Sequence, residues 1–145
     1  SKRKPNLTRE ELEEIAKQNG VDEFYSTLVE NLRGFFDGSR TTRSSLGFDG
    51  KNIEELGRGV IFNLIPPESN QEKGLKFQVY SHRFSHYFKC SIQDLLDILP
   101  MNRQDWTYEQ SDKGKLWLGY AGFFKTSKEI EVFLEGLREI AANKK

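Results

Sequence analysis

GVIFNLIPPESNQEKGLKFQVYS, residues 59–81, decides the fold because it holds two strand-like segments joined by a polar connection. The first segment, 59–65, is rich in β-branched and aromatic residues and ends at two prolines, which lack the backbone N–H of a paired strand. The second, 75–81, alternates apolar and polar side chains, as a strand with one buried face does. We predict an antiparallel pair joined by a long hairpin loop over 66–74. The side chains expected to face inward on the second strand are Leu75, Phe77 and Val79.

Two longer amphipathic helices are expected to pack on these strands. Asp22 can cap a helix over 22–36, in which apolar residues recur at helical spacing. Near the other end of the chain, Thr126 with Glu129 three residues later forms a capping-box pattern that opens a helix over 127–142. The buried stripe expected on that last helix is Ile130, Phe133, Leu134, Leu137 and Ile140.

Smaller elements surround this core. A capping-box pattern at Thr8 opens a charged, peripheral helix over 8–18, preceded by a tail at 1–7 that we expect to be flexible. Short helices are predicted over 82–88 and 92–99, the second opening on another capping-box pattern.

Further strands are expected on both sides of the central pair. A short strand is predicted over 44–48, followed by a turn and loop over 49–59. Later in the chain, strands over 106–108 and 116–124 are joined by a turn at 111–115. Because connections are short and strands do not alternate with helices, the fold class predicted is α+β. We expect one domain over 8–145, with an antiparallel sheet of four to five strands packed by the two longer helices and with short helices inserted.

Composition excludes some classes of protein and partner. The 145 residues contain 22 Lys plus Arg and 22 Asp plus Glu, so the whole molecule has no net field that attracts polyanions. No apolar run approaches the roughly 18 residues that a membrane span needs. The lone cysteine, Cys90, cannot form an internal disulfide, which favours a reducing compartment and predicts a cytoplasmic protein.

Several segments together resemble a known type of domain. They are FYSTLVENLRGFF, SSLGF, GVIFNLI, GLKFQVY, a Trp-containing segment, GYAGFF and TSKEIEVFLEGLREI, in that order. This order is similar to that of small uncharacterised α+β domains at the C-termini of restriction-like nucleases and of predicted transport or endonuclease-like proteins. The resemblance covers about residues 22–140 and carries over no catalytic residue. It implies an accessory or recognition domain in DNA defence or DNA modification.

Local charge gives the clearest functional signal. The stretch 73–93 contains four basic residues and no acid, with tyrosines interleaved, and the stretch 39–45 contains two arginines among hydroxyl residues. Cations neutralise phosphates, and exposed rings stack on bases. The residues expected to bind nucleic acid are Arg40, Arg43, Lys76, Tyr80, Arg83, Tyr87, Lys89 and Trp117.

Three functions stay open from the sequence. The leading hypothesis is a non-catalytic module that binds DNA or RNA; the first alternative is a protein-interaction domain that uses the aromatic segment 106–124. The second alternative is a small hydrolase or nuclease that uses His82 or His86, with Cys90 as a conceivable nucleophile. His82 and His86 have a spacing that can hold zinc, but the chain lacks a third histidine, and Asp94 or Asp97 would have to complete the site. We therefore assign no catalytic residue, no metal ligand and no cofactor.

Overall fold

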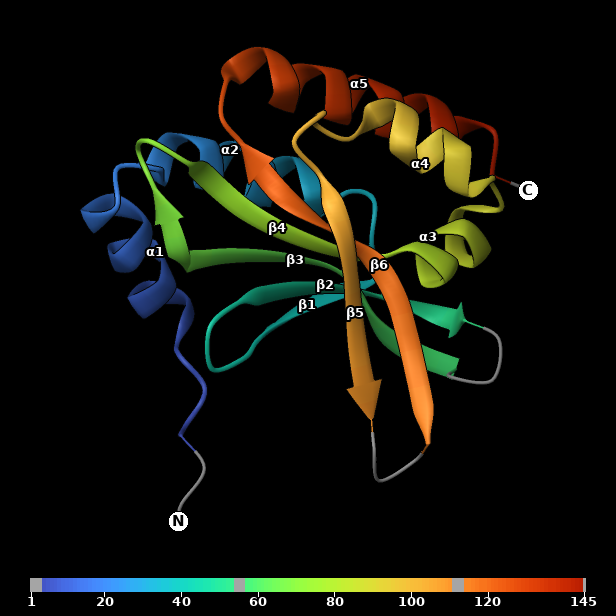
Figure 1. The fold of residues 1–145 in the computed structure, drawn as a ribbon, viewed down its shortest axis with the longest axis horizontal. Coiled ribbons are helices and arrows are strands. Elements are labelled where there is room, and N and C mark those ends of the chain that lie inside the picture. The colour runs from blue at the N-terminus through green and yellow to red at the C-terminus, as the bar shows by residue number, and fades with distance from the viewer. Residues whose placement is uncertain (1–3, 54–56, 111–113, 145) are drawn as a thin grey trace.

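The computed structural model describes residues 4–53, 57–110 and 114–144 (Figure 1). The predicted tail 1–7, loop 49–59 and turn 111–115 therefore lie partly outside the described residues. Within them, the helices are α1 (Arg9–Gln18), α2 (Asp22–Leu32), α3 (Ser81–Phe88), α4 (Ile92–Ile98) and α5 (Ser127–Ala142). The strands are β1 (Gly38–Thr41), β2 (Leu46–Ile53), β3 (Gly57–Asn70), β4 (Gly74–Tyr80), β5 (Gln104–Gln110) and β6 (Lys115–Phe124).

The strands form one antiparallel sheet, which confirms the α+β class. Its order is β1-β2-β3-β4-β6-β5, so the described residues contain six strands, more than the four to five predicted. The central β3 and β4 pair as expected, with Phe62 opposite Val79. The extra strand, β1, comes from the predicted polar segment 39–45, which carries no apolar alternation and so gives no strand signal.

The connection between β3 and β4 is shorter than predicted. β3 runs through Pro66 and Pro67 to Asn70, so the expected hairpin loop over 66–74 is wrong in length. The register shifts between Ile65 and Asn70, which accommodates the prolines. Across this irregular stretch, the Ser69 hydroxyl accepts from the Lys76 N–H at 2.7 Å and donates to the Ile65 carbonyl at 2.9 Å. One side chain thus satisfies backbone groups that a regular ladder would have paired.

Two other boundaries differ from prediction. β2 continues to Ile53, so much of the expected loop 49–59 is strand, although its residues are of the turn-forming type. α2 ends at Leu32, and its N-cap is Val21, which makes no side-chain capping bond; Asp22 lies in the first turn instead of capping the helix.

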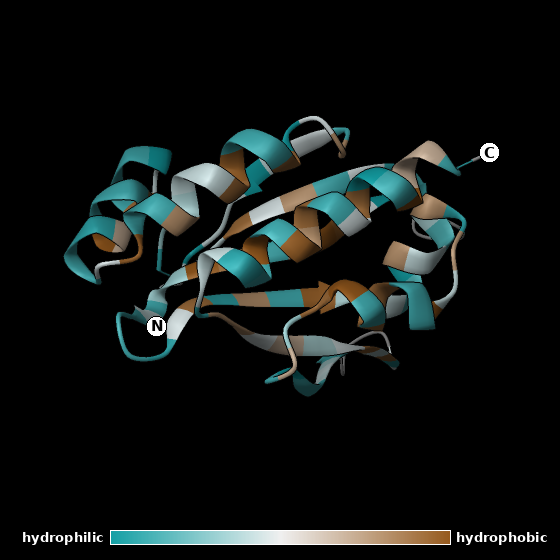
Figure 2. Ribbon diagram, turned by 90° about the horizontal axis from the view of Figure 1, so that it is seen from above, coloured by the Kyte–Doolittle hydropathy of each residue, from teal (hydrophilic) through white to brown (hydrophobic). Residues whose placement is uncertain are grey.

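Phenylalanine side chains join the sheet to α5 in the core. The Phe133 ring on α5 lies 5.3 Å from the rings of both Phe62 and Phe124, and the Phe77 ring lies 4.9 Å from that of Phe124. Figure 2 looks down on the molecule and shows the helix that leads to the C-terminus in front of the strands, with hydrophobic and hydrophilic residues alternating along it. The expected stripe of α5 is buried at Ile130, Phe133, Leu134 and Leu137, while Ile140 is half-buried. Among the described residues no helix is long and apolar enough to cross a membrane.

The opposite face of the sheet carries a row of paired residues across all six strands, which we call the polar row because its members on β1, β3, β4 and β5 are polar. Directly paired residues in antiparallel strands lie on the same face. The row is Arg40, Gly47, Asn63, Gln78, Ala121 and Gln104, each paired with the next. Tyr80 and Lys76 flank Gln78 on β4 and share its face, because alternate residues of a strand point the same way.

Replacing Gly119 with alanine should destabilise the protein. A Cβ atom there would lie 2.0 Å from the Val79 carbonyl oxygen, so β4 and β6 would have to move apart. We expect the free energy of unfolding, measured by urea denaturation, to fall by about 3 kcal/mol, as overpacking does. Gly34→Ala is the matched control, because the nearest atom to its new Cβ is 3.7 Å away. The control should change stability by no more than about 0.5 kcal/mol; equal effects would contradict the close approach.

Candidate functional site

The sheet opens where β4 ends. β4 stops at Tyr80, opposite Gly119 of β6. Its two neighbours are longer at this end, because β3 begins at Gly57 and β6 begins at Lys115. The first residues of α3 supply hydrogen bonds here: the Ser81 hydroxyl donates to the Leu118 carbonyl at 3.2 Å, and Arg83 Nη1 donates to the Val60 carbonyl at 2.6 Å. Side chains of α3 thus pair with carbonyls that β4 no longer reaches.

The Arg83 guanidinium lies between two aromatic rings in this opening. Its central carbon is 3.9 Å from the centre of the Tyr80 ring and 4.4 Å from that of the Trp117 ring. Both distances are well within the range of a cation–π contact. Arg83 is only 8% exposed, so this sequence-predicted phosphate contact is a largely buried cation.

No carboxylate neutralises Arg83 among the residues that the structure describes. The ion pairs formed there are Arg58 with Asp49 and Lys76 with Glu68. Arg83 Nε is buried and donates to no acceptor in the same part of the chain. Burial lowers the pKa of Arg83, the Tyr80 hydroxyl opposes that shift, and the charge of Arg40 adds to it. The charge is therefore held by ring faces and one carbonyl, an environment that favours an added anion.

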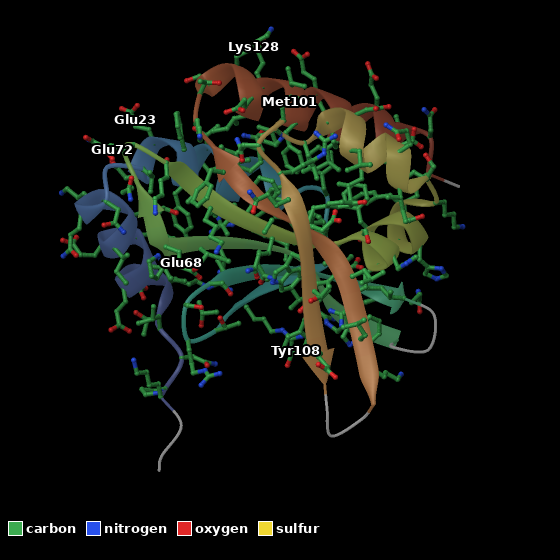
Figure 3. The ribbon with its side chains drawn as sticks, in the orientation of Figure 1. Glu23, Glu68, Glu72, Met101, Tyr108 and Lys128 are labelled. Atoms are coloured by element: carbon green, nitrogen blue, oxygen red, sulfur yellow. The ribbon has the colours of Figure 1, made fainter. Side chains whose placement is uncertain are left out.

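Further aromatic residues adjoin Arg83 on the same face. The Trp106 ring lies 5.0 Å from the Tyr80 ring, and Tyr108 pairs with Trp117 across the β5–β6 hairpin. Tyr108 is 44% exposed, and Figure 3 shows it toward the far end of β5. We call this set the arginine-aromatic face; its members are Arg40, Tyr80, Arg83, Trp106, Tyr108 and Trp117.

The remaining predicted contacts lie elsewhere. The Lys76 ammonium forms an ion pair with Glu68 at 2.8 Å, which reduces its availability to phosphate. Arg43 is exposed beyond the end of β1. Tyr87 and Lys89 lie at the opposite end of α3 from Arg83, beside a separate hollow. The structure therefore brings Arg40, Tyr80, Arg83 and Trp117 into one region and leaves the other four predicted residues outside it.

The two histidines of α3 are exposed, whereas Phe84 and Phe88 are buried, as the helical spacing predicts. His86 Nε2 lies 3.1 Å from the Asn52 carbonyl oxygen. Within residues 4–53, 57–110 and 114–144, no group of three or more His, Cys, Asp or Glu side chains could hold a metal ion. No observation in that part of the chain favours the hydrolase or nuclease alternative.

Trp106 and Tyr108 belong to the site although the predicted contacts omit them. Their alternation in the sequence places both side chains on one face of a strand. Pairing them with Gly119 and Trp117 requires the register of the β5–β6 hairpin. In the sequence, the only sign that these two residues belong to a site was their aromatic character. The sequence did not show which face of the sheet Arg83 would contact.

The Cys90 thiol is poorly suited to act as a nucleophile. Burial, followed by the nearby charge of Asp94, raises its pKa to about 11. A thiol with a raised pKa is almost entirely protonated at neutral pH, and the thiolate is the reactive form.

Alkylation of Cys90 should accordingly be slow at pH near neutrality. We expect iodoacetamide to react at least about tenfold more slowly than with the same chain unfolded in urea, where the thiol regains an ordinary pKa. The rate in the folded protein should rise as the pH approaches its raised pKa of about 11. Equal rates in folded and unfolded chains, measured by mass spectrometry, would argue for an activated thiol.

Comparisons with protein-family models, with curated proteins and with solved structures found no match. The resemblance to domains of restriction-like nucleases therefore stays a prediction.

Proposed function

We propose that the protein is a non-catalytic module that binds single-stranded nucleic acid through the arginine-aromatic face. The observation that carries the proposal is the buried Arg83 guanidinium, which lies between Tyr80 and Trp117 with no carboxylate beside it among the described residues. Burying a charge is costly unless it is compensated, so such an arrangement is typical of a site that receives an anion.

The chemistry of the face suits a strand with exposed bases. Aromatic rings on a sheet stack on unpaired bases, and neighbouring cations hold the phosphates that connect them. Tyr108 offers an exposed ring, and Arg40, exposed on β1, offers a guanidinium that can bind a phosphate through two hydrogen bonds. Gln78 and Gln104 in the polar row add amide groups that can donate to and accept from base edges. A duplex hides the faces of its bases, so a single strand is the better fit.

A protein-interaction role is the second candidate, and a specific observation favours it. Leu116 is 59% exposed and Leu118 is 46% exposed, although both are large apolar residues. They alternate with Trp117 on β6 and so lie on the other face of the β5–β6 hairpin. Exposed apolar side chains grouped on one projecting strand are typical of a contact with another chain.

Short oligonucleotides should bind, and the single-stranded form should bind more tightly than the duplex. If Arg40 and Arg83 each neutralise one phosphate, the logarithm of affinity should fall against the logarithm of salt concentration with a slope of about −1.4. Fluorescence anisotropy with a labelled strand of roughly 12 nucleotides measures both quantities.

Tyr108→Ala should weaken binding by about tenfold through lost stacking. Arg40→Gln should weaken it and reduce the slope by about 0.7.

Arg138→Gln is the matched control for Arg40, since Arg138 lies exposed on α5, away from the arginine-aromatic face. It should leave affinity unchanged. Absence of binding at low salt, or equal affinity in Tyr108→Ala, Arg40→Gln and the unmodified protein, would rule out the proposed function.

Leu116→Ser combined with Leu118→Ser separates the two candidates. Because these residues lie on the hairpin face opposite Trp117, nucleic-acid affinity should stay within about twofold of the unmodified protein if bases stack on the aromatic side. A loss comparable to that of Tyr108→Ala would show that the apolar side of the hairpin makes the contact. Circular dichroism of each variant checks that it is folded.

A further inference from the structure

A basic hollow lies at the end of α3 that is remote from Arg83. Its volume is about 310 Å³, and residues far apart in the sequence line it. They come from the segment after α2, from β2, from the end of α3 and from the C-terminal segment. The side chains that define its chemistry are Asp37, Lys51, His86, Tyr87, Lys89 and Lys144.

Positive charge predominates in this hollow. Three lysines and one aspartate line it, and these four side chains carry a net formal charge of +2. The aspartate is already engaged: its Oδ2 accepts from the Lys51 N–H at 2.8 Å, and it forms a hydrogen bond with Tyr87. The bond from the Lys51 N–H is the main cause that lowers the pKa of Asp37, so this carboxylate stays ionised while it holds local structure.

The walls of the hollow are fixed by the fold. The Lys144 ammonium lies 3.5 Å from the centre of the Tyr87 ring, which is buried beneath it. Burial, followed by the hydrogen bond with Asp37, raises the pKa of Tyr87 to about 12, so its hydroxyl keeps its proton. Tyr87 therefore contributes a buried, uncharged side chain to the hollow, in contact with the Lys144 ammonium.

The backbone around the hollow is strained. In the described chain the non-glycine residues with positive φ are Asn52, at 58°, and Lys89, at 55°, and both line this hollow. A left-handed conformation costs a residue with a Cβ about 1 to 2 kcal/mol, and the position after a helix normally favours glycine. Such strain tends to gather at functional sites. Lys89 occupies that position after α3 and lines the hollow.

We propose that this hollow binds a phosphate dianion, carried either by a small molecule or at the end of a nucleic-acid strand. A terminal phosphate has a charge close to −2 at neutral pH and three acceptor oxygens. These suit a hollow lined by three lysines with a net formal charge of +2, whereas an internal phosphodiester carries a single charge. The proposal stands independently of the arginine-aromatic face, because the two sites share no residue.

Inorganic phosphate is the first probe. In nitrogen-edited NMR spectra, with ionic strength held constant by sodium chloride, phosphate should produce saturable shifts in Lys51, Asn52 and Lys89. Lys51→Gln and Lys89→Gln should each weaken phosphate binding by about tenfold, the usual effect of removing a charged hydrogen bond. Lys128→Gln is the matched control, since Lys128 is exposed at the start of α5 and does not line the hollow (Figure 3), and it should have no effect. Thermal melting of each variant confirms that it folds.

Oligonucleotides with a 5′-phosphate or a 5′-hydroxyl then distinguish the two sources. Tighter binding of the phosphorylated strand, lost in Lys89→Gln, would identify a strand end. Saturable phosphate binding without that preference would identify a small phosphorylated molecule. The proposal is overturned if chloride alone reproduces the shifts, or if both lysine variants bind phosphate as the unmodified protein does. Tyr108→Ala should leave phosphate affinity unchanged, so failure of the proposed function and failure of this site are separable.

Discussion

The end of β4 at Tyr80 is the constraint on which the rest of the structure depends. Because β3 and β6 continue beyond it, carbonyl groups of both strands need new donors, and α3 supplies them through Ser81 and Arg83. That requirement fixes the first turn of α3 against the sheet and places its last turn beside β2 and the C-terminal segment. The two candidate sites thus lie at the two ends of one short helix, each set in place by backbone hydrogen bonding as well as by apolar packing.

The sequence predicted correctly the helix starts that depend only on neighbouring residues. The capping boxes at Thr8, Ser91 and Thr126 are all present, because each requires only a hydroxyl and an acid three residues apart. β1 and the later part of β2 escaped prediction because their polar and glycine residues are held in strands by their neighbours. The same holds for Pro66 and Pro67, which remain within β3 because Ser69 restores the lost hydrogen bonding.

The sequence predicted which kinds of residue form the candidate sites, but not which individual residues come together in each. The basic stretch from Lys73 to Lys89 is visible in the sequence, yet its cations separate in space. The Lys76 ammonium forms an ion pair with Glu68 across the β3–β4 hairpin, whose turn is shorter than the two prolines suggest. Arg83 turns inward because Val60, although paired with Asp49 of β2, has no partner on the β4 side. Lys144 joins the hollow from the far end of the chain, a proximity that only tertiary structure creates.

The buried Arg83 guanidinium keeps its charge over a wide range of pH. Arginine keeps its proton throughout the range of pH in which proteins operate, and the lowering of the Arg83 pKa by burial does not change this. Unlike an imidazole, it cannot act as an acidity sensor. Every folded copy of this domain therefore carries the same permanent positive charge at this point, in an acidified compartment as in an alkaline one, and a change of pH alone does not remove it.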